Sequence, residues 1–436
     1  PPDQGSPLTR PPPGLRAARL ACLAVLVAPL AAQAAVWQVG PDGALADAIA
    51  RAAPGDTLRI APGHYPANLV IDKPLTLVGA DPAHRPTLDG GNRGNVITVK
   101  SEDVTLDSLI IRDSGDDLGA QNAGVYLGPG AHRAVVRRCD FAYTLFGLWI
   151  EKANGVRIEN NLITGKRDYM SPQRGNAIQL YNTQGAQIIG NRISFARDGI
   201  YVDVSHYAVF RGNRIHHVRY GTHYMNSYHN VWENNDVYRN RGGLALMEVR
   251  DQIVRNNRAW ANSDHGIMLR TIQDSVIENN VVADNVRGFF IYDAEYNTLR
   301  NNLVIGNRVG VHLWAGSYRN TVEGNDFIRN REQVRYVASR DQEWGKQTGN
   351  YWSNYLGWDH DEDGRGDIPY EANDVVDRLT WRYPVAKLLM HSPAVQTLRM
   401  IARQFPVLRV PSVVEAHPAM QPHHANWREW IHAERH

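Results

Sequence analysis

Short segments of alternating apolar and polar residues recur through the middle of the chain, each beside an asparagine. The segments VRIENNLITG, VWENNDVYRN and VIENNVVADN show the pattern, and valine, isoleucine and leucine fill the alternate places. Alternation with a period of two is typical of strands, so each segment predicts short strands and a turn. The recurring asparagine stands at eight positions: Asn161, Asn191, Asn213, Asn235, Asn257, Asn280, Asn302 and Asn325.

The spacing of these positions indicates the fold. Successive asparagines are 30, then 22, 22, 22, 23, 22 and 23 residues apart. A glycine that precedes an alternating strand keeps the same step at Gly199, Gly221, Gly243, Gly266, Gly288 and Gly310. Two independent markers with one period indicate a true repeat. A period of 22 or 23 residues is too short for repeats of paired helices, and the segments lack the regularly spaced leucines of a leucine-rich repeat. We therefore predict an all-β, right-handed, single-stranded parallel β-helix with coils of about 22 residues and an inward asparagine ladder.

The repeat also sets the boundaries of the other segments. We expect a signal peptide over 1–34, an N-terminal cap over 35–56, the β-helix over 57–335, a C-terminal cap with an acidic loop over 336–378, a C-terminal docking helix over 379–415 and a flexible His-rich tail over 416–436. The first cap should contain a short amphipathic helix at 44–53, because the end of a β-helix exposes unpaired strand edges. The long gap before Asn191 predicts a loop at 166–173 that leaves the stack.

Composition adds the compartment and excludes one class of partner. Lys and Arg number 47 against 45 Asp and Glu, a net charge of +2 that gives no sign of a nucleic-acid partner. Arginines precede an apolar run at 20–30 and small residues follow it, as in a cleaved secretory signal. The alternative is an uncleaved anchor helix, although the run is short for a membrane span. The mature chain then keeps one cysteine, Cys139, which we expect to be a small buried filler at a ladder position.

The strand after each marker glycine should present two outward columns. Residues one and three places after the glycine point inward, so those two and four places after it point outward. The first column reads Trp149, Tyr201, His223, Ala245, Met268, Phe290 and His312. The second column reads Glu151, Asp203, Met225, Met247, Arg270, Tyr292 and Trp314.

Three of the seven methionines fall on this face, in consecutive coils beside a histidine. Thioether and imidazole groups are ligands that together select Cu(I), and coils about 4.8 Å apart bring such side chains within reach of one ion. We predict a Cu(I) site formed by His223, Met225, Met247 and Met268. The alternative is an apolar docking patch that binds no metal.

The same face could instead serve a carbohydrate-binding or polysaccharide-modifying protein, of the lyase or epimerase kind. Aromatic residues of both columns, with Glu151, Asp203 and Arg270, could line a sugar groove. Hydrolysis needs two carboxylates at a defined separation, and Glu151 and Asp203 should lie about 10 Å apart because one coil intervenes. That separation is wide for an acid and base pair, so we expect no catalytic residues.

The run WDHDEDGRGDIPY, residues 358–370, predicts a second metal site of a different kind. Asp359, Asp361, Asp363 and Asp367 match positions one, three, five and nine of a calcium loop, and Gly364 takes the place of the sharp turn. The twelfth position carries Tyr370 in place of the bidentate glutamate, so the loop is an incomplete EF-hand. The alternative is a solvated acidic turn without an ion.

The run GNYWSNYLGWDHDEDGRGDIPY at 349–370, after an asparagine repeat and before RYPVAKLLM at 382–390, resembles the NosD family. The resemblance spans about residues 36–415. It implies a non-enzymatic periplasmic copper-binding protein of the β-helix fold. Such proteins work with the ATPase and membrane subunits of an ABC transporter and with a copper chaperone lipoprotein to mature the copper centres of nitrous oxide reductase. The resemblance does not fix the copper ligands, and it makes the helix at 385–405 the expected element for docking on the transporter.

Overall fold

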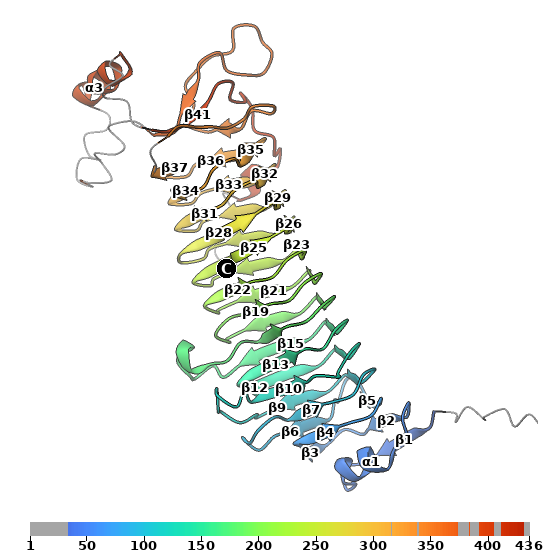
Figure 1. Ribbon diagram of the computed structural model, residues 1–436. Coiled ribbons are helices and arrows are strands. Elements are labelled where there is room, and N and C mark those ends of the chain that lie inside the picture. The colour runs from blue at the N-terminus through green and yellow to red at the C-terminus, as the bar shows by residue number, and fades with distance from the viewer. Residues whose placement is uncertain are drawn as a thin grey trace, which may run out of the picture. The chain divides into compact units, whose positions relative to one another are not determined.

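The computed structural model describes residues 34–314, 316–337, 340–373, 383, 392–404 and 411–430. Residues 1–33 of the predicted signal peptide lie outside this set. Residues Ala34–His436 form one compact unit, and within it the chain winds as a right-handed parallel β-solenoid of about 14 turns. The predicted fold class is therefore confirmed, and Figure 1 shows the coils stacked in chain order.

Three long parallel sheets run along the stack, and each coil contributes one strand to each sheet. Sheet 1 contains β1 (Val36–Val39), β2 (Thr57–Ile60), β5 (Thr76–Gly79), β8 (Thr105–Asp107), β11 (Val135–Arg137), β14 (Arg157–Glu159), β17 (Gln187–Ile189), β20 (Val209–Arg211), β23 (Val231–Glu233), β26 (Ile253–Arg255), β29 (Val276–Glu278), β32 (Thr298–Arg300) and β35 (Thr321–Glu323). Sheet 2 contains β4 (Leu69–Ile71), β7 (Ile97–Val99), β10 (Ala123–Leu127), β13 (Phe146–Glu151), β16 (Ile178–Tyr181), β19 (Ile200–Asp203), β22 (Tyr220–Met225), β25 (Gly242–Arg250), β28 (His265–Gln273), β31 (Arg287–Tyr292), β34 (Val309–Trp314) and β37 (Glu332–Val337). Sheet 3 contains β3 (His64–Pro66), β6 (Thr87–Asp89), β9 (Ile110–Arg112), β12 (Asp140–Thr144), β15 (Leu162–Gly165), β18 (Arg192–Ser194), β21 (Arg214–His216), β24 (Asp236–Tyr238), β27 (Arg258–Trp260), β30 (Val281–Ala283), β33 (Leu303–Ile305), β36 (Asp326–Ile328) and β39 (Tyr351–Trp352).

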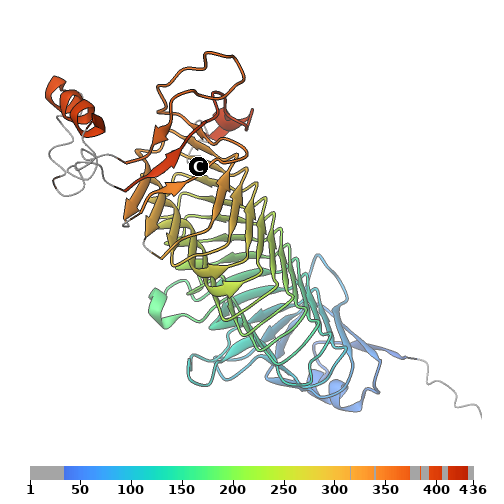
Figure 2. The ribbon, with the colours of Figure 1, turned by 45° about the horizontal axis from the view of Figure 1, so that its top comes forward.

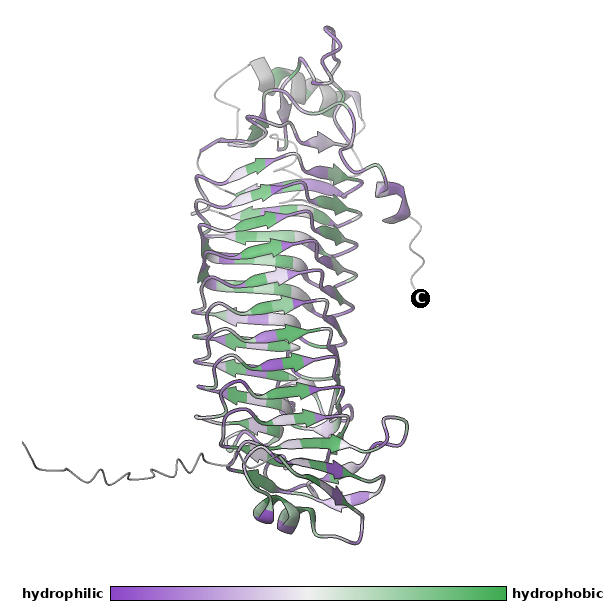
Figure 3. Cartoon of the chain, turned by 90° about the vertical axis from the view of Figure 1, so that its right-hand side faces the viewer, coloured by the Kyte–Doolittle hydropathy of each residue, from purple (hydrophilic) through white to green (hydrophobic). Residues whose placement is uncertain are grey.

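The core is the space that the three sheets enclose. Each coil sends its alternate apolar residues inward, such as Ile200, Val202 and Phe210, all fully buried. Figure 3 shows the consequence, with hydrophobic residues in the strands and hydrophilic ones at the turns. An alternating sequence therefore becomes a continuous apolar column, because successive strand residues point to opposite sides.

The predicted asparagine ladder is present and lies inside the turns between sheets 1 and 3. The Asn235 side chain shows the repeating unit: its Oδ1 accepts from the backbone N–H of Asn213 at 3.0 Å, and its Nδ2 donates to Oδ1 of Asn257 at 2.9 Å. Cys139 starts the ladder, since its N–H donates to Asn161 Oδ1 at 2.9 Å. The Cys139 thiol is buried, which raises its pKa to about 12 and fits an inert filler.

The ladder continues beyond the predicted repeat and ends on a buried carboxylate. Asn350 takes the next place after Asn325, and Glu415 accepts hydrogen bonds from Asn350 Nδ2 and Trp352 Nε1, both at 2.9 Å. Burial raises the pKa of Glu415 to about 7, although these donors act in the opposite direction. A second ladder in the turns between sheets 3 and 2 joins Asn240, Asn262, Asn285, Asn307 and Asn330.

The N-terminal end differs slightly from the predicted boundary. Helix α1 (Leu45–Arg51) lies inside the expected helix at 44–53 and buries Leu45, Ala48 and Ile49 against the first coil. Strand β1 already pairs with β2, so the sheets begin at Val36, inside the segment predicted as the cap. The coil and its cap therefore overlap in sequence, because the helix is inserted between two strands of one sheet.

The predicted loop at 166–173 leaves the stack and contains the 3-10 helix η1 (Ser171–Gln173), the green helical turn beside the coils in Figures 1 and 2. Its first residue, Lys166, is buried and forms an ion pair with Asp116. Lys166 Nζ also donates to the Ser114 backbone oxygen at 3.1 Å and lies 5.0 Å from the ring centre of Tyr143. The loop is thus fastened to the coil beneath it at its root.

The C-terminal segments depart furthest from the predictions. A small sheet joins β38 (Gln342–Glu343), β41 (Val413–Glu415) and β40 (Tyr370–Glu371). Within the expected helix at 379–415, α3 covers Pro393–Gln404, whereas Val413–Glu415 forms β41, whose Glu415 ends the ladder. Residues 379–382, 384–391 and 405–410 of the expected segment lie outside the described set. Among the described helices, none is long and apolar enough to cross a membrane.

The tail predicted to be flexible from 416 is packed as far as Trp430. The backbone N–H groups of His423 and His424 donate to Asp326 at 3.0 and 2.7 Å, and His424 Nδ1 lies 2.7 Å from the same carboxylate. The 3-10 helix η4 (Trp427–Trp430) places its two tryptophans against an apolar cluster of β30, β33 and β36. The prediction of flexibility is wrong for these residues, because a buried carboxylate and an apolar patch hold them on the coils.

Candidate functional site

The strand register confirms the two outward columns on sheet 2. Tyr201 pairs with His223, His223 with Ala245, Ala245 with Met268, and Met268 with Phe290. The structure adds Gln179 and Tyr181 between the first two members of each column. These two were missed because Ala177 stands in their coil where the marker glycine is expected.

His223 is oriented by a buried ion pair. Its Nδ1 lies 3.0 Å from Asp198 Oδ2, and Arg219 binds the same carboxylate through Nε at 2.8 Å and Nη2 at 2.6 Å. Burial acts to raise the pKa of Asp198, but the hydrogen bonds from His223 and Arg219 outweigh it and lower that pKa. The Nδ1 atom also lies 3.1 Å from Arg219 Nη2, so the carboxylate and the guanidinium together fix the ring, much as a carboxylate orients a histidine that binds metal through its other nitrogen.

Met225 lies beside this histidine and is half-buried. The hydroxyl of Tyr201 lies 3.7 Å from Met225 Sδ, in position to donate to the thioether. The Tyr201 ring packs edge-on against His223, with 4.6 Å between ring centres. The tyrosine therefore touches both predicted ligands and restricts the positions that they can take.

Met247 and Met268 follow on the next two coils, and both are half-buried. Ala245 stands between His223 and Met268 in the first column, and its side chain is the smallest there. The Cα atoms of His223 and Met268 are two coils apart, about 10 Å, while Met225 and Met247 belong to adjacent coils. The register thus gathers all four predicted ligands on one part of the sheet around a small residue.

A further histidine, His265, was missed by the sequence analysis. It opens β28 directly before the marker glycine Gly266 and is fully buried. Neither ring nitrogen has a hydrogen-bond partner among the described residues, and the Asp264 carboxylate stays 3.8 Å from Nδ1. Burial lowers the pKa of His265, because the charged imidazole is poorly solvated there. A buried ring nitrogen without a hydrogen bond is also unfavourable.

The ring of His265 lies where a neighbouring side chain would otherwise be. A Cβ added to Gly242 would come within 2.5 Å of His265 Nε2, so the ring rests over the glycine backbone. Tyr220 lies between the two imidazoles, 5.6 Å from the ring centres of both His265 and His223. His265 stands one place before the marker glycine of its coil. The sequence analysis considered only the positions after each glycine, so a column written one place before the glycines would have found it.

His312, farther along the first column, is buried as well. Its Nε2 accepts from Trp314 Nε1 at 2.6 Å, and its Nδ1 has no partner in the described part of the chain. Burial is the main cause that lowers the pKa of His312 to about 4. Burial therefore favours the neutral imidazole at His265 and His312, the form that binds soft metal ions.

The two carboxylates of the second column lie on coils that are not adjacent. The register places Tyr181 between Glu151 and Asp203, so the two belong to coils separated by one other. Glu151 accepts from the Tyr126 hydroxyl at 2.7 Å, and burial, with Glu151 beside it, raises the pKa of Tyr126 to about 12. Two coil spacings place the Cα atoms of Glu151 and Asp203 about 10 Å apart.

The acidic loop brings together three of its four predicted ligands. Carboxylate oxygens of Asp359, Asp361 and Asp363 lie within 4.8 Å of one another. Asp367 is outside this trio, and its Oδ2 accepts from the His360 N–H at 2.7 Å. Gly364, at φ +85°, makes the turn, and its N–H donates to Asp359 Oδ2 at 2.9 Å. Asp367 is thus not gathered with the trio in this structure, and its part in a calcium site stays a prediction.

Comparisons with known proteins show which proteins this chain is similar to. A family model described as "Periplasmic copper-binding protein (NosD)" matches residues 159–357, and a model for a "Protein of unknown function (DUF1565)" matches residues 38–249. The "Probable ABC transporter binding protein NosD" of Pseudomonas aeruginosa is 40% identical over 380 residues, covering 83% of this chain and 87% of that protein. The protein of the same description from Stutzerimonas stutzeri is 38% identical over 379 residues, with 83% and 86% covered.

Solved structures agree on the fold. The Streptococcus pneumoniae surface protein and adhesin PfbA matches with a TM-score of 0.52 at 11% identity, over 67% of this chain and 94% of that one. The Dettilon tailspike protein matches with a TM-score of 0.50 at 15% identity, over 67% and 63%. Identities this low show a shared β-helix and carry nothing about activity.

Proposed function

The chain belongs to the NosD family, and from this premise we propose that it is a periplasmic copper-binding accessory protein for the maturation of nitrous oxide reductase. In this role it works with the ATPase and membrane subunits of an ABC-type transporter and with a copper chaperone lipoprotein. The relatives are described as ABC transporter binding proteins, which supports association with such a transporter. We propose no catalytic residues.

The observation that carries the copper part of the proposal is the buried, unpartnered imidazole of His265 next to the methionine columns. A buried polar group without a hydrogen bond costs about 1–3 kcal/mol, so the fold keeps His265 at the expense of stability. A soft metal ion bound to a ring nitrogen would remove that cost. His223, with Nδ1 on Asp198 and Nε2 available, has the arrangement of a metal-binding histidine.

We propose that His223, Met225, Met247 and Met268 bind Cu(I), with His265, three residues before Met268 on β28, as a further imidazole at the edge of the site. Sulfur and imidazole ligands select Cu(I) over harder ions. The copper would be cargo, bound on sheet 2 and passed on. The acidic loop has hard oxygen ligands, and we propose that its trio binds Ca²⁺ as a structural clip between the last coils and α3.

A Cu(I) titration of the purified chain under reducing conditions, against a chromogenic chelator, tests the site. The double variant Met225→Leu and Met247→Leu keeps the volume of both side chains and removes both sulfurs, so Cu(I) affinity should fall at least tenfold. Met170→Leu is the matched control, because Met170 is exposed on the loop that contains η1. Unchanged affinity in the double variant would show that the face is an apolar docking patch.

The role in maturation has its own test. The copper content of nitrous oxide reductase should fall in a strain that lacks this protein and recover with the wild-type chain but not with the double variant. Uronate release or elimination on an acidic polysaccharide by the purified chain would instead favour the carbohydrate alternative.

A further inference from the structure

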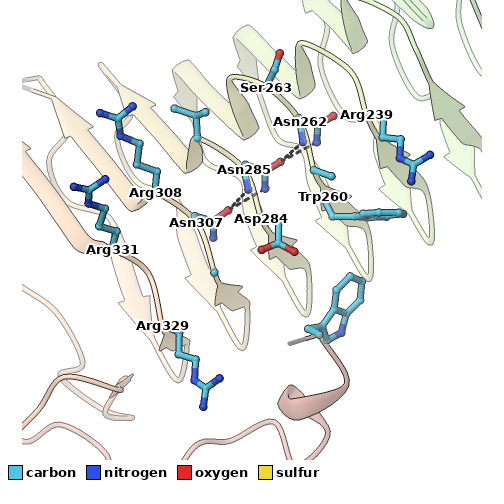
Figure 4. Close-up of a pocket in the computed structure, with 14 residues that line it drawn as sticks. Arg239, Trp260, Asn262, Ser263, Asp284, Asn285, Asn307, Arg308, Arg329 and Arg331 are labelled. Atoms are coloured by element: carbon cyan, nitrogen blue, oxygen red, sulfur yellow. Dashed lines mark hydrogen bonds between the residues drawn. The ribbon is translucent and has the colours of Figure 1, made fainter. Parts of the chain in front are cut away.

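A pocket of about 700 Å³ lies on the edge of the β-helix between sheets 3 and 2, at the turns that precede β28, β31 and β34. Figure 4 shows it across the second asparagine ladder, with Asn262, Asn285 and Asn307 at its base. Its other lining residues come from the turns on either side of that ladder and from the C-terminal tail: Arg239, Trp260, Ala261, Ser263, Asp284, Val286, Gly306, Arg308, Arg329, Arg331 and Trp430. The volume is in the range of sites that hold a small organic ligand.

The pocket exists because bulky side chains stop at this point of the stack. Tyr238 and Trp260 stack on adjacent coils, with 4.7 Å between ring centres, and the next coil in register presents Ala283. The neighbouring turn position is small at Ala261 and Gly306. One face of Trp260 therefore has no ring from the following coil, and space remains beside it.

The tail closes one side of this space. Trp427 and Trp430 pack with Trp260 against the apolar cluster of Ala283, Leu303, Ile305 and Ile328. The tail is held in this place by Asp326, which accepts from the backbone of His423 and His424. An indole of the tail thus lies on the same pocket as an indole of the coils, although 170 residues separate Trp260 from Trp430.

Three arginines that line the pocket are exposed and lack a carboxylate partner among the described residues. They are Arg308, Arg329 and Arg331, and Arg329 lies 5.7 Å from the ring centre of Trp427. On sheet 1, by contrast, several arginines form ion pairs with glutamates of the neighbouring coils. Glu233 binds both Arg211 and Arg255, and Glu278 binds Arg300. Arg308, Arg329 and Arg331 therefore bring positive charge to the pocket, whose lining also contains the carboxylate of Asp284.

We infer that this pocket binds an oxyanion-bearing ligand with a flat or ring-shaped body, such as an acidic sugar. A guanidinium binds carboxylate or phosphate through two parallel N–H groups, and nearby cations gain most when an anion lies between them. The open face of Trp260 and the Trp430 indole suit the body of such a ligand, because indoles stack on flat apolar surfaces. This activity is separate from copper binding and does not rest on it.

Calorimetric titration of the full chain with three probes tests the inference: a galacturonate trimer, glucose 6-phosphate and citrate. The two sugars distinguish carboxylate from phosphate, and citrate carries charge without a ring. We expect one of the sugars to bind more tightly than citrate, with an affinity that falls as the salt concentration rises. Weak, equal binding of all three would mean an adventitious ion only and would overturn the inference, as would no binding at millimolar probe.

Variants place the binding in the pocket. The double variant Arg308→Gln and Arg331→Gln should weaken the preferred sugar at least tenfold, whereas Arg300→Gln, a matched control paired with Glu278 on sheet 1, should leave it unchanged. Trp430→Leu should weaken the sugar more than citrate. Sugar affinity that survives the double arginine variant would overturn the assignment. Cu(I) affinity should stay at the wild-type value in every variant, so failure of this inference is distinguishable from failure of the copper proposal.

Discussion

The asparagine ladder and the buried histidines of sheet 2, His265 and His312, treat buried polar groups in opposite ways. Each ladder amide accepts and donates at distances near 3 Å, and the last place is closed by Glu415 with three donors. On sheet 2, both nitrogens of His265 and one of His312 are buried without partners among the described residues. The difference indicates that the ladder stabilises the fold, whereas His265 and His312 do not serve stability in the same way.

The comparison also explains why the ladder repeats and the outward face does not. A ladder amide must match the coil above and below, so the same residue recurs in every turn. The outward columns have no such constraint, and adjacent coils carry His223, Ala245 and Met268. Regular positions thus hold the fold together, and the proposed copper site lies at irregular positions.

The largest effect should follow from breaking the ladder. Asn257→Ala removes the acceptor for Asn235, whose N–H and amide lie 3.0 and 2.9 Å away, and the donor to the Trp232 carbonyl. Because these groups stay buried without partners, the free energy of unfolding should fall by about 3–5 kcal/mol. Urea unfolding measures it, and Gln187→Ala on the exposed side of β17 serves as control, with a change within about 0.5 kcal/mol. An Asn257→Ala chain as stable as the wild type would mean that the ladder adds regularity without stability.

Replacing His265 should not lower the free energy of unfolding as Asn257→Ala does. His265→Leu removes a buried polar group that had no partner, so stability should change by less than about 1 kcal/mol or rise. Cu(I) affinity should fall at least tenfold in the same variant. Urea unfolding and chelator competition give the two values, and His84→Leu, at an exposed histidine, is the control for both. A loss of stability like that of Asn257→Ala with unchanged Cu(I) affinity would place His265 with the ladder as a structural residue.

The sequence predicted the regular part of the molecule well, because the markers report the register directly. Asn and Gly recur once per coil, so the outward columns, with His223 next to Ala245 and Met268, could be written down without a structure. The marker pattern does not reveal a coil that lacks the glycine. Ala177 takes the glycine position in one coil, so Gln179 and Tyr181 were not assigned to the columns. It also failed at His265, which follows an extra residue in its coil and precedes the marker glycine.

The contacts of the C-terminal segments could not be predicted from periodicity. Asp326 holds His423 and His424 from 97 and 98 positions away, and Asn350 meets Glu415 over 65. Such pairs depend on where the chain returns to the stack, and no local pattern reports that. The separation of Asp367 from the acidic trio depends on one backbone N–H, that of His360, which the spacing of aspartates does not encode.

A smaller effect should appear in the pH dependence of stability. The folded-state pKa of His312 is about 4 because the ring is buried, while that of the unfolded chain is near 6.5. The unfolded chain therefore takes up this proton first, so the stability that His312 contributes is complete above pH 6.5 and declines as the pH falls toward 4. His312→Phe should remove about 1–2 kcal/mol of the difference between unfolding at pH 7.5 and at pH 4.5, a discounted value because solvent partly screens the ring. An unchanged difference would show that His312 is hydrated and does not belong with the buried imidazoles.

The smallest effect concerns the acidic loop, whose oxygens are hard and exposed. Calcium sites of extracellular modules bind at about 0.1–1 mM, so 10 mM Ca²⁺ on a 1 mM site adds about 1.4 kcal/mol, which raises the Tm of a chain this long by about 2 °C. Asp361→Asn should abolish that rise, and Asp367→Asn should preserve it, because Asp361 belongs to the trio and Asp367 does not. Cu(I) affinity should be the same with Ca²⁺ and with a Ca²⁺ chelator. If the chelator instead lowered Cu(I) affinity, Ca²⁺ binding at the loop and Cu(I) binding on sheet 2 would be coupled. The loop could then not be a purely structural site.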